Sequence, residues 1–155
     1  MSPSTGTILV GYDGSAAADS ALQWAARTAS LEGRKVRALM AVSDSSSSPA
    51  SRGVDPAHEM RARVDAVLAA AGVSGAAEWH SGHVVPILLR EAIGASMLVV
   101  GSQGHGWAAE TVRGSVSQHL ARHAPCPAGA LIGTPAQPTC EVAWCDPTPT
   151  NSLVR

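Results

Sequence analysis

Residues 7–13, TILVGYD, form a continuous apolar run that ends on a carboxylate. Neighbouring residues of a strand point to opposite faces of a sheet, so this run predicts a strand buried on both faces, as in a parallel sheet covered by helices. Ser15 can cap a helix directly after it. Apolar residues then recur at helical spacing as far as Gly33, a residue type that commonly ends helices. The stretch therefore predicts a strand followed by a helix.

The same alternation continues along the chain. Further strands are predicted at residues 35–42, 76–80, 96–100 and 128–132, and further helices at residues 56–71, 85–92 and 115–123. Five strands that alternate with four helices predict an open α/β fold, with a five-stranded parallel sheet, helices on both faces and right-handed crossovers.

The chain has 155 residues, which suits one domain. We assign residues 1–133 to this domain. Residues 134–155 contain four prolines and no apolar periodicity, so we expect a Pro-rich tail that is largely disordered.

Charge and composition exclude several classes of function. The net charge is −1 and no basic stripe is present, which argues against nucleic acid or an anionic membrane as a partner. No apolar run approaches the roughly 20 residues that span a bilayer, and no signal peptide precedes the first strand. Three cysteines without framework spacing, Cys126, Cys140 and Cys145, suit a reducing compartment and favour neither a disulfide nor a metal site. We expect a cytoplasmic protein.

Ligands of open parallel sheets bind outside the carboxyl ends of strands, where the strand order reverses. The first predicted strand ends in Gly11, Tyr12 and Asp13, and the fourth runs into Gly101. A carboxylate at this position can accept hydrogen bonds from ribose hydroxyls, and a glycine lets the backbone approach a ligand without a Cβ in the way. The alternative for Asp13 is a turn residue that only caps the first helix.

A glycine-rich loop follows the fourth predicted strand. Gly104 and Gly106 permit positive φ, so successive backbone N–H groups can point into one concavity that suits an anion. Gly114 and Ser115 then begin a helix, whose free N–H groups and dipole attract phosphate. The sequence therefore predicts a phosphate site, with a flexible surface turn as the alternative. It is not a Walker loop, because no Gly-Lys-Ser/Thr is present.

Three further side chains of this segment are candidates for phosphate contact. The hydroxyl of Ser117, like that of Ser115, can donate to phosphate. Arg113 can balance phosphate charge, and His105 lies inside the loop. Solvent-exposed side chains are the alternative for Arg113 and His105.

The spacing Gly101-x2-Gly104-x9-Gly114-Ser115 resembles the ATP-binding signature of the universal stress proteins. The stretches ILVGYDGS, LVVGSQGHG and GSVSQHLARHAPCP are similar to that family's first strand, its fourth strand with the loop, and its last helix. The resemblance covers residues 7 to about 132. It implies strand order 3-2-1-4-5, dimerisation, and ATP binding in stress signalling.

The resemblance also implies roles for single residues. Asp13 would lie by the ribose and adenine, Ala41 would offer backbone atoms to the adenine, and Gly101 would lie near the ribose. The phosphates would be surrounded by Gly104, Gly114, Ser115 and Val116. One departure is Ser96, which stands where the family often has Asp before the fourth strand.

We therefore expect an ATP-binding regulatory domain, with Mg²⁺ or Mn²⁺ on the phosphates. Nucleotide occupancy would set the order of the loop, and the loop would set contacts with a protein partner or between the subunits of a homodimer. No catalytic residue is assigned, because no second carboxylate accompanies the phosphate loop as a general base. The alternatives are a slow ATP hydrolase or phosphotransferase, a nucleotide-free interaction module, and a cyclic AMP binder.

Overall fold

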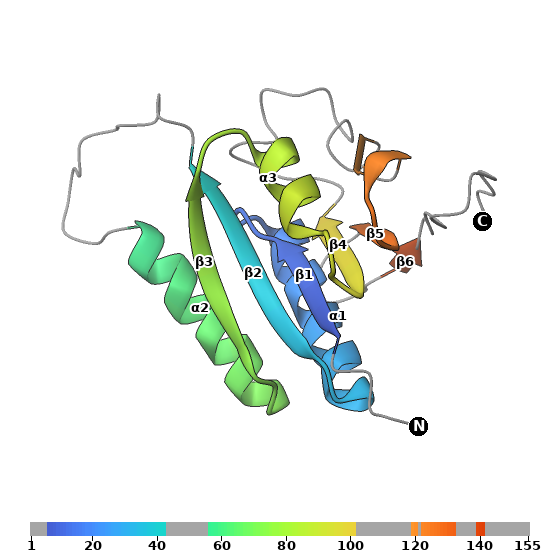
Figure 1. Ribbon diagram of the computed structural model, residues 1–155. Coiled ribbons are helices and arrows are strands. Elements are labelled where there is room, and N and C mark those ends of the chain that lie inside the picture. Colours follow the sequence, from blue (N-terminus) through green and yellow to red (C-terminus); the bar gives the residue numbers. More distant parts are fainter. Residues whose placement is uncertain (1–5, 43–55, 102–118, 121, 133–138, 142–155) are drawn as a thin grey trace.

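The computed structural model describes residues 6–42, 56–101, 119–120, 122–132 and 139–141 (Figure 1). The elements in chain order are β1 (Thr7–Gly11), α1 (Ala16–Glu32), β2 (Lys35–Val42), α2 (Pro56–Ala71), β3 (Gly75–Ser81), α3 (Val84–Glu91), β4 (Met97–Gly101), β5 (Ala128–Ile132) and β6 (Thr139–Glu141). Residues 119–120 and 122–123 are also helical.

The strands form one sheet in the order β3-β2-β1-β4-β5-β6. The first five are parallel to their neighbours, which confirms the predicted fold class and the order 3-2-1-4-5. The sixth strand pairs with β5 in the antiparallel direction. It lies in the segment that we expected to be a tail, and three residues without apolar alternation give no sequence signal for a strand.

The helices cover both faces of the sheet, with α1 and α2 on one face and α3 on the other (Figure 1). Ile8, Val10 and Tyr12 pack in the cluster that contains α1 and α2. Leu9 points the other way, into the cluster that contains Leu88 of α3. The strand predicted from TILVGYD is therefore buried on both faces, as its apolar run indicated.

Helix α1 begins and ends at the predicted residues. The Oγ of Ser15 accepts a hydrogen bond from the backbone N–H of Ala18 at 3.1 Å, which satisfies one free donor of the first turn. Gly33 ends the helix at φ 66°, in the left-handed region. Among the described residues, no helix combines the length and the apolarity that crossing a membrane requires.

Candidate functional site

The carboxyl ends of β1 and β4 lie side by side at the middle of the sheet. The two strands are parallel, and Gly11 of β1 is in register with Val100 of β4. The chain continues from β1 to β2 on one side and from β4 to β5 on the other, so the strand order reverses between these two strands. Ligand crevices of open α/β sheets occur at such a point, and we therefore build the candidate site here.

Asp13 follows β1 at this point of the sheet and uses its two carboxylate oxygens differently. Oδ1 accepts a hydrogen bond from the backbone N–H of Ser15 at 3.0 Å. Oδ2 is buried and has no hydrogen-bond partner among the described residues. A role for Asp13 as a turn residue alone therefore accounts for only one of its two carboxylate oxygens. A buried acceptor without a partner is costly, and Oδ2 is the atom of this carboxylate that a ligand donor would satisfy.

The glycines at the ends of β1 and β4 are required by packing. A Cβ on Gly101 would lie 2.6 Å from the carbonyl carbon of Ala17, in the first turn of α1. A Cβ on Gly11 would lie 2.9 Å from Cγ1 of Val100 and 3.2 Å from Cδ1 of Leu88. Both glycines thus permit close contacts within the chain, and the predicted close approach of a ligand to either residue stays a prediction.

Tyr12, the neighbour of Asp13, is packed into the core. Its side chain is fully buried, and its hydroxyl donates to Oδ1 of Asp19 at 2.6 Å. Its backbone N–H donates to the carbonyl of Leu39 at 2.9 Å. Burial and the Asp19 carboxylate both raise the pKa of Tyr12 well above its ordinary value. The Tyr12 hydroxyl and backbone N–H therefore both have hydrogen-bond partners within the chain. The predicted contact of Tyr12 with a ligand would be made by its backbone carbonyl.

The remaining candidates divide into two groups. Ala41 is partly exposed near the carboxyl end of β2, where it is in register with His80 of β3. The candidates from the glycine-rich loop lie outside the described residues, and their placement stays a prediction: Gly104, His105, Gly106, Arg113, Gly114, Ser115, Val116 and Ser117.

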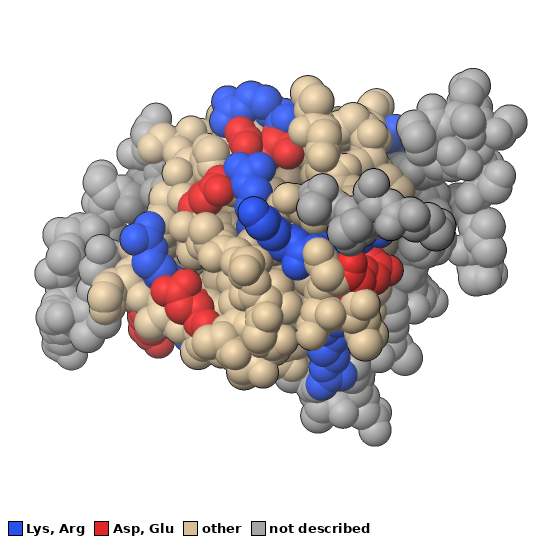
Figure 2. Space-filling model, turned by 60° about the horizontal axis from the view of Figure 1, so that its bottom comes forward, with Lys and Arg blue, Asp and Glu red and all other residues tan. Residues whose placement is uncertain are grey.

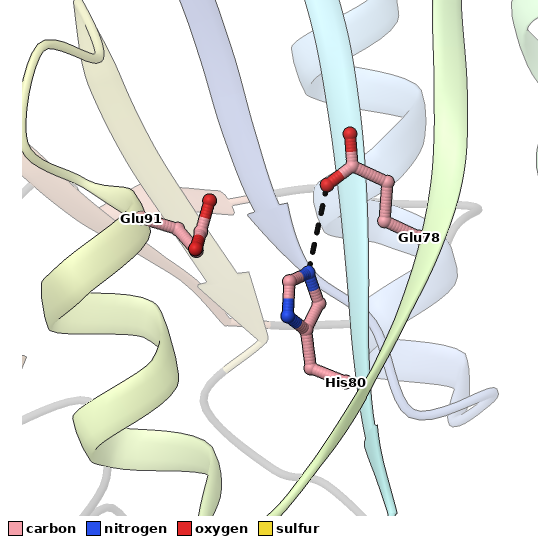
Figure 3. A group of neighbouring side chains, drawn as sticks. All are labelled: Glu78, His80 and Glu91. Atoms are coloured by element: carbon pink, nitrogen blue, oxygen red, sulfur yellow. Dashed lines mark ion pairs between the residues drawn. The ribbon is translucent and has the colours of Figure 1, made fainter.

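A second polar cluster lies on the α3 face, where sequence reasoning identified no site. Glu78, His80 and Glu91 each offer one ligand atom within 4.8 Å of the others, and Figure 3 shows the two β3 side chains and that of α3 converging. Nη2 of Arg37 lies 2.6 Å from Oε2 of Glu78 and 2.9 Å from Oε2 of Glu91. The cation between these carboxylates is therefore a guanidinium.

The same contacts shift the pKa values of the cluster. Hydrogen bonds to Glu78 and Glu91 raise the pKa of Arg37. Hydrogen bonds from Arg37 lower the pKa of both carboxyls below their ordinary value of 4.5. His80, whose Nε2 lies 3.5 Å from Oε2 of Glu78, lowers the pKa of Glu78 further. Arg37 is 41 positions from Glu78 and 54 from Glu91, so no local pattern could indicate this network.

The surface at the lower end of the molecule carries both signs of charge. Figure 2 shows basic and acidic side chains interspersed on this face instead of a patch of one sign. On this face, the distribution agrees with the net charge of −1.

Comparison with known proteins decides the family. Residues 5–128 match the universal stress protein family. This chain belongs to that family. The universal stress protein Rv2624c of Mycobacterium tuberculosis is 32% identical over 146 residues, which cover 92% of this chain and 54% of the relative. The chain thus spans about half the length of the curated relatives that it matches.

Solved structures of the family share the fold. A universal stress protein in complex with cAMP superposes with a TM-score of 0.65 at 22% identity, over 84% of this chain and 98% of that one. A family member from Arabidopsis thaliana with AMP bound gives a TM-score of 0.58 at 18% identity, over 81% of this chain and 90% of that one. At this identity the likeness concerns the fold, and it confirms the predicted universal stress protein architecture.

Proposed function

We propose that this universal stress protein binds an adenine nucleotide at the carboxyl ends of β1 and β4, and that the nucleotide is ATP. The observation that carries the proposal is the buried Oδ2 of Asp13, which has no partner among the described residues and lies where the strand order reverses. Two proteins of the same fold, solved with cAMP and with AMP, support adenine as the base.

Each part of the nucleotide has its own proposed contacts. Asp13 accepts hydrogen bonds from the ribose through Oδ2, while Oδ1 stays bound to the amide of Ser15. The backbone of Ala41 contacts the adenine. The glycine-rich loop and the helix predicted to begin at Ser115 hold the phosphates, and Mg²⁺ or Mn²⁺ binds to the phosphates themselves.

The proposed role is regulation. Nucleotide occupancy would order residues 102–114, and the ordered loop would contact a protein partner or a second subunit in a cytoplasmic homodimer. Amide exchange across residues 102–114, measured with and without ATP, tests this step. Exchange that stays unchanged in the complex would remove the regulatory part of the proposal and leave the binding site.

The binding site is tested by calorimetric titration with ATP, ADP, AMP and cAMP, together with identification of the nucleotide that co-purifies with the protein. We expect ATP to bind, and Gly104→Val and Gly114→Val to weaken it at least about tenfold, or about 1.4 kcal/mol. Failure of all four nucleotides to bind at millimolar concentration would overturn the proposal. Tighter binding of cAMP than of ATP would make cAMP the ligand. Steady release of phosphate from ATP would favour the alternative of a slow ATP hydrolase.

A further inference from the structure

Helix α2 reaches the turn that carries Asp13 through a single arginine. Nη1 of Arg63 donates to the carbonyl oxygen of Gly14 at 3.3 Å. Nη2 of the same guanidinium lies 2.5 Å from Oδ2 of Asp19, in the first turn of α1. Met60, one helical turn before Arg63, packs beneath the turn, since a Cβ on Gly14 would lie 3.0 Å from its Sδ.

The carbonyl that Arg63 contacts belongs to the peptide group that holds Asp13. The C=O of Gly14 and the N–H of Ser15 are the two ends of one planar unit and point in opposite directions. The N–H end donates to Oδ1 of Asp13, while the C=O end accepts from Arg63. A rotation of this peptide would break both hydrogen bonds together. A donor bound to the carbonyl also polarises the unit and strengthens its N–H as a donor.

This peptide follows a residue that imposes little restraint of its own. Gly14 has φ 79°, in the left-handed region that glycine enters without steric cost. The direction of the peptide therefore depends on its hydrogen bonds. The guanidinium is itself held by Asp19, which also accepts a hydrogen bond from the hydroxyl of Tyr12 at 2.6 Å. Asp19 therefore anchors the residue before Asp13 directly and the residue after it through Arg63.

We infer that Arg63 is a positioning residue for the nucleotide site, which acts by fixing the Gly14–Ser15 peptide and, through it, the Asp13 carboxylate. The inference rests on the proposed function, because it assigns Asp13 to the ribose. In this inference, Arg63 acts on the nucleotide only through its contact with Gly14. Its side chain is 43% exposed, and exposed ion pairs contribute little to stability, so its removal is expected to affect the site more than the fold.

The first test needs no ligand. In the free protein, Arg63→Met keeps the aliphatic stem and removes both contacts. We expect exchange of the Ser15 amide, followed by NMR, to become at least about tenfold faster, because the peptide then rotates away from Asp13 more often. Arg61→Met is the matched control, since Arg61 is exposed on the same helix and makes no hydrogen bond or ion pair with the described residues. Unchanged Ser15 exchange in Arg63→Met would overturn the inference.

The second test uses AMP with its 2′-deoxy and 3′-deoxy forms as probes of the ribose contact. We expect the wild type to bind AMP more tightly than the form that lacks the hydroxyl contacted by Asp13. Asp13→Asn should bind the two forms equally well. We expect Arg63→Met to reduce the ratio between the affinities for AMP and for the deoxy form at least about threefold. The affinity for AMP itself should fall by a similar factor. The double variant with Asp13→Asn should bind no worse than Asp13→Asn alone, because Arg63 acts only through Asp13.

The outcomes separate the two proposals. If the wild type binds neither these three nucleotides nor ATP, ADP or cAMP, the proposed function fails, while Ser15 exchange still reports on the peptide. If the wild type binds AMP more tightly than its deoxy forms, and Arg63→Met does so by the same factor, only the inference fails. Additive losses in the double variant would mean an independent role for Arg63 and would likewise overturn it. Arg63→Lys, which keeps a donor and the charge opposite Asp19, is the second variant and should restore part of the ribose preference.

Discussion

Gly101, the last residue of β4, lies directly against the backbone of Ala17 in the first turn of α1. A Cβ on Gly101 would lie 2.6 Å from the carbonyl carbon of Ala17 and 2.8 Å from its carbonyl oxygen. Side chains can rotate away from such a clash, but a helix backbone cannot. This contact therefore fixes how closely the end of β4 approaches the first turn of α1.

Gly101→Ala is expected to destabilise the protein by about 1 to 3 kcal/mol, because the added methyl forces β4 and α1 apart. Denaturant unfolding measures the change. Ser30→Thr, which adds a methyl group at an exposed position of α1, is the control and should change stability by less than about 0.5 kcal/mol. An unchanged unfolding free energy for Gly101→Ala would mean that the close contact relaxes without cost.

The same residue illustrates what a sequence can and cannot predict. The apolar run before Gly101 correctly predicted a buried strand, and the alternation of such runs with helical periodicity predicted the parallel sheet. The sequence suggests a ligand as the reason for the glycine itself. A glycine in a sequence does not indicate which neighbour would exclude a side chain, and in the structure that neighbour is Ala17.

Residues that act across elements were missed for a similar reason. Asp13 could be found because it ends a strand at a position where ligands bind. Arg63 lies 49 positions from Gly14, and Arg37 lies 54 from Glu91, so their contacts exist only once the sheet and helices have packed. Strand β6 depends in the same way on its pairing with β5.

The Arg37 cluster predicts a dependence of stability on pH. The folded-state pKa values of Glu78 and Glu91 lie below their ordinary value of 4.5, so the stabilisation is present above that pH and is lost as the pH falls through the folded values. Arg37→Met should cost about 1 to 3 kcal/mol at pH 7. The difference from the wild type should shrink as the pH falls through the lowered folded-state pKa values of Glu78 and Glu91, because the carboxyls then bind protons in both proteins.

Unfolding free energies measured between pH 3 and pH 7 check this prediction. Arg27→Met is the control, because Arg27 is exposed on α1 and makes no ion pair with the part of the chain that the structure describes. It should follow the wild-type curve. A difference between Arg37→Met and the wild type that stays constant with pH would show that packing of the arginine stem, and not its charge, is responsible.

Deletion of residues 136–155 removes β6 and turns β5 into an edge strand. We expect the melting temperature to stay within a few degrees of the full chain, because only three of the described residues leave the sheet. The exposed backbone groups of β5 should increase self-association, since unpaired edges can pair with another chain. Sedimentation velocity over a range of concentrations measures this. A much larger fall in melting temperature would show that the segment is part of the core.

Substitutions of Ser15 and Asp13 should have opposite effects on stability and on nucleotide affinity, although the two residues share a hydrogen bond. Ser15→Ala removes the Oγ that accepts the Ala18 N–H, so it should cost about 1 kcal/mol of stability. It retains the backbone N–H that donates to Asp13 Oδ1, and nucleotide affinity should therefore change little. Asp13→Asn should do the reverse.

In Asp13→Asn, the amide oxygen can still accept from the Ser15 amide, so the turn is retained. The NH2 group replaces Oδ2, which is buried and has no partner among the described residues, so a polar group without a partner stands there in both proteins. Stability should therefore change by less than about 1 kcal/mol, while affinity for AMP should fall at least about tenfold. Thermal unfolding and calorimetric titration of both variants measure the four quantities. Loss of stability without loss of affinity in Asp13→Asn would assign this residue to the turn alone and would exclude it from the nucleotide site.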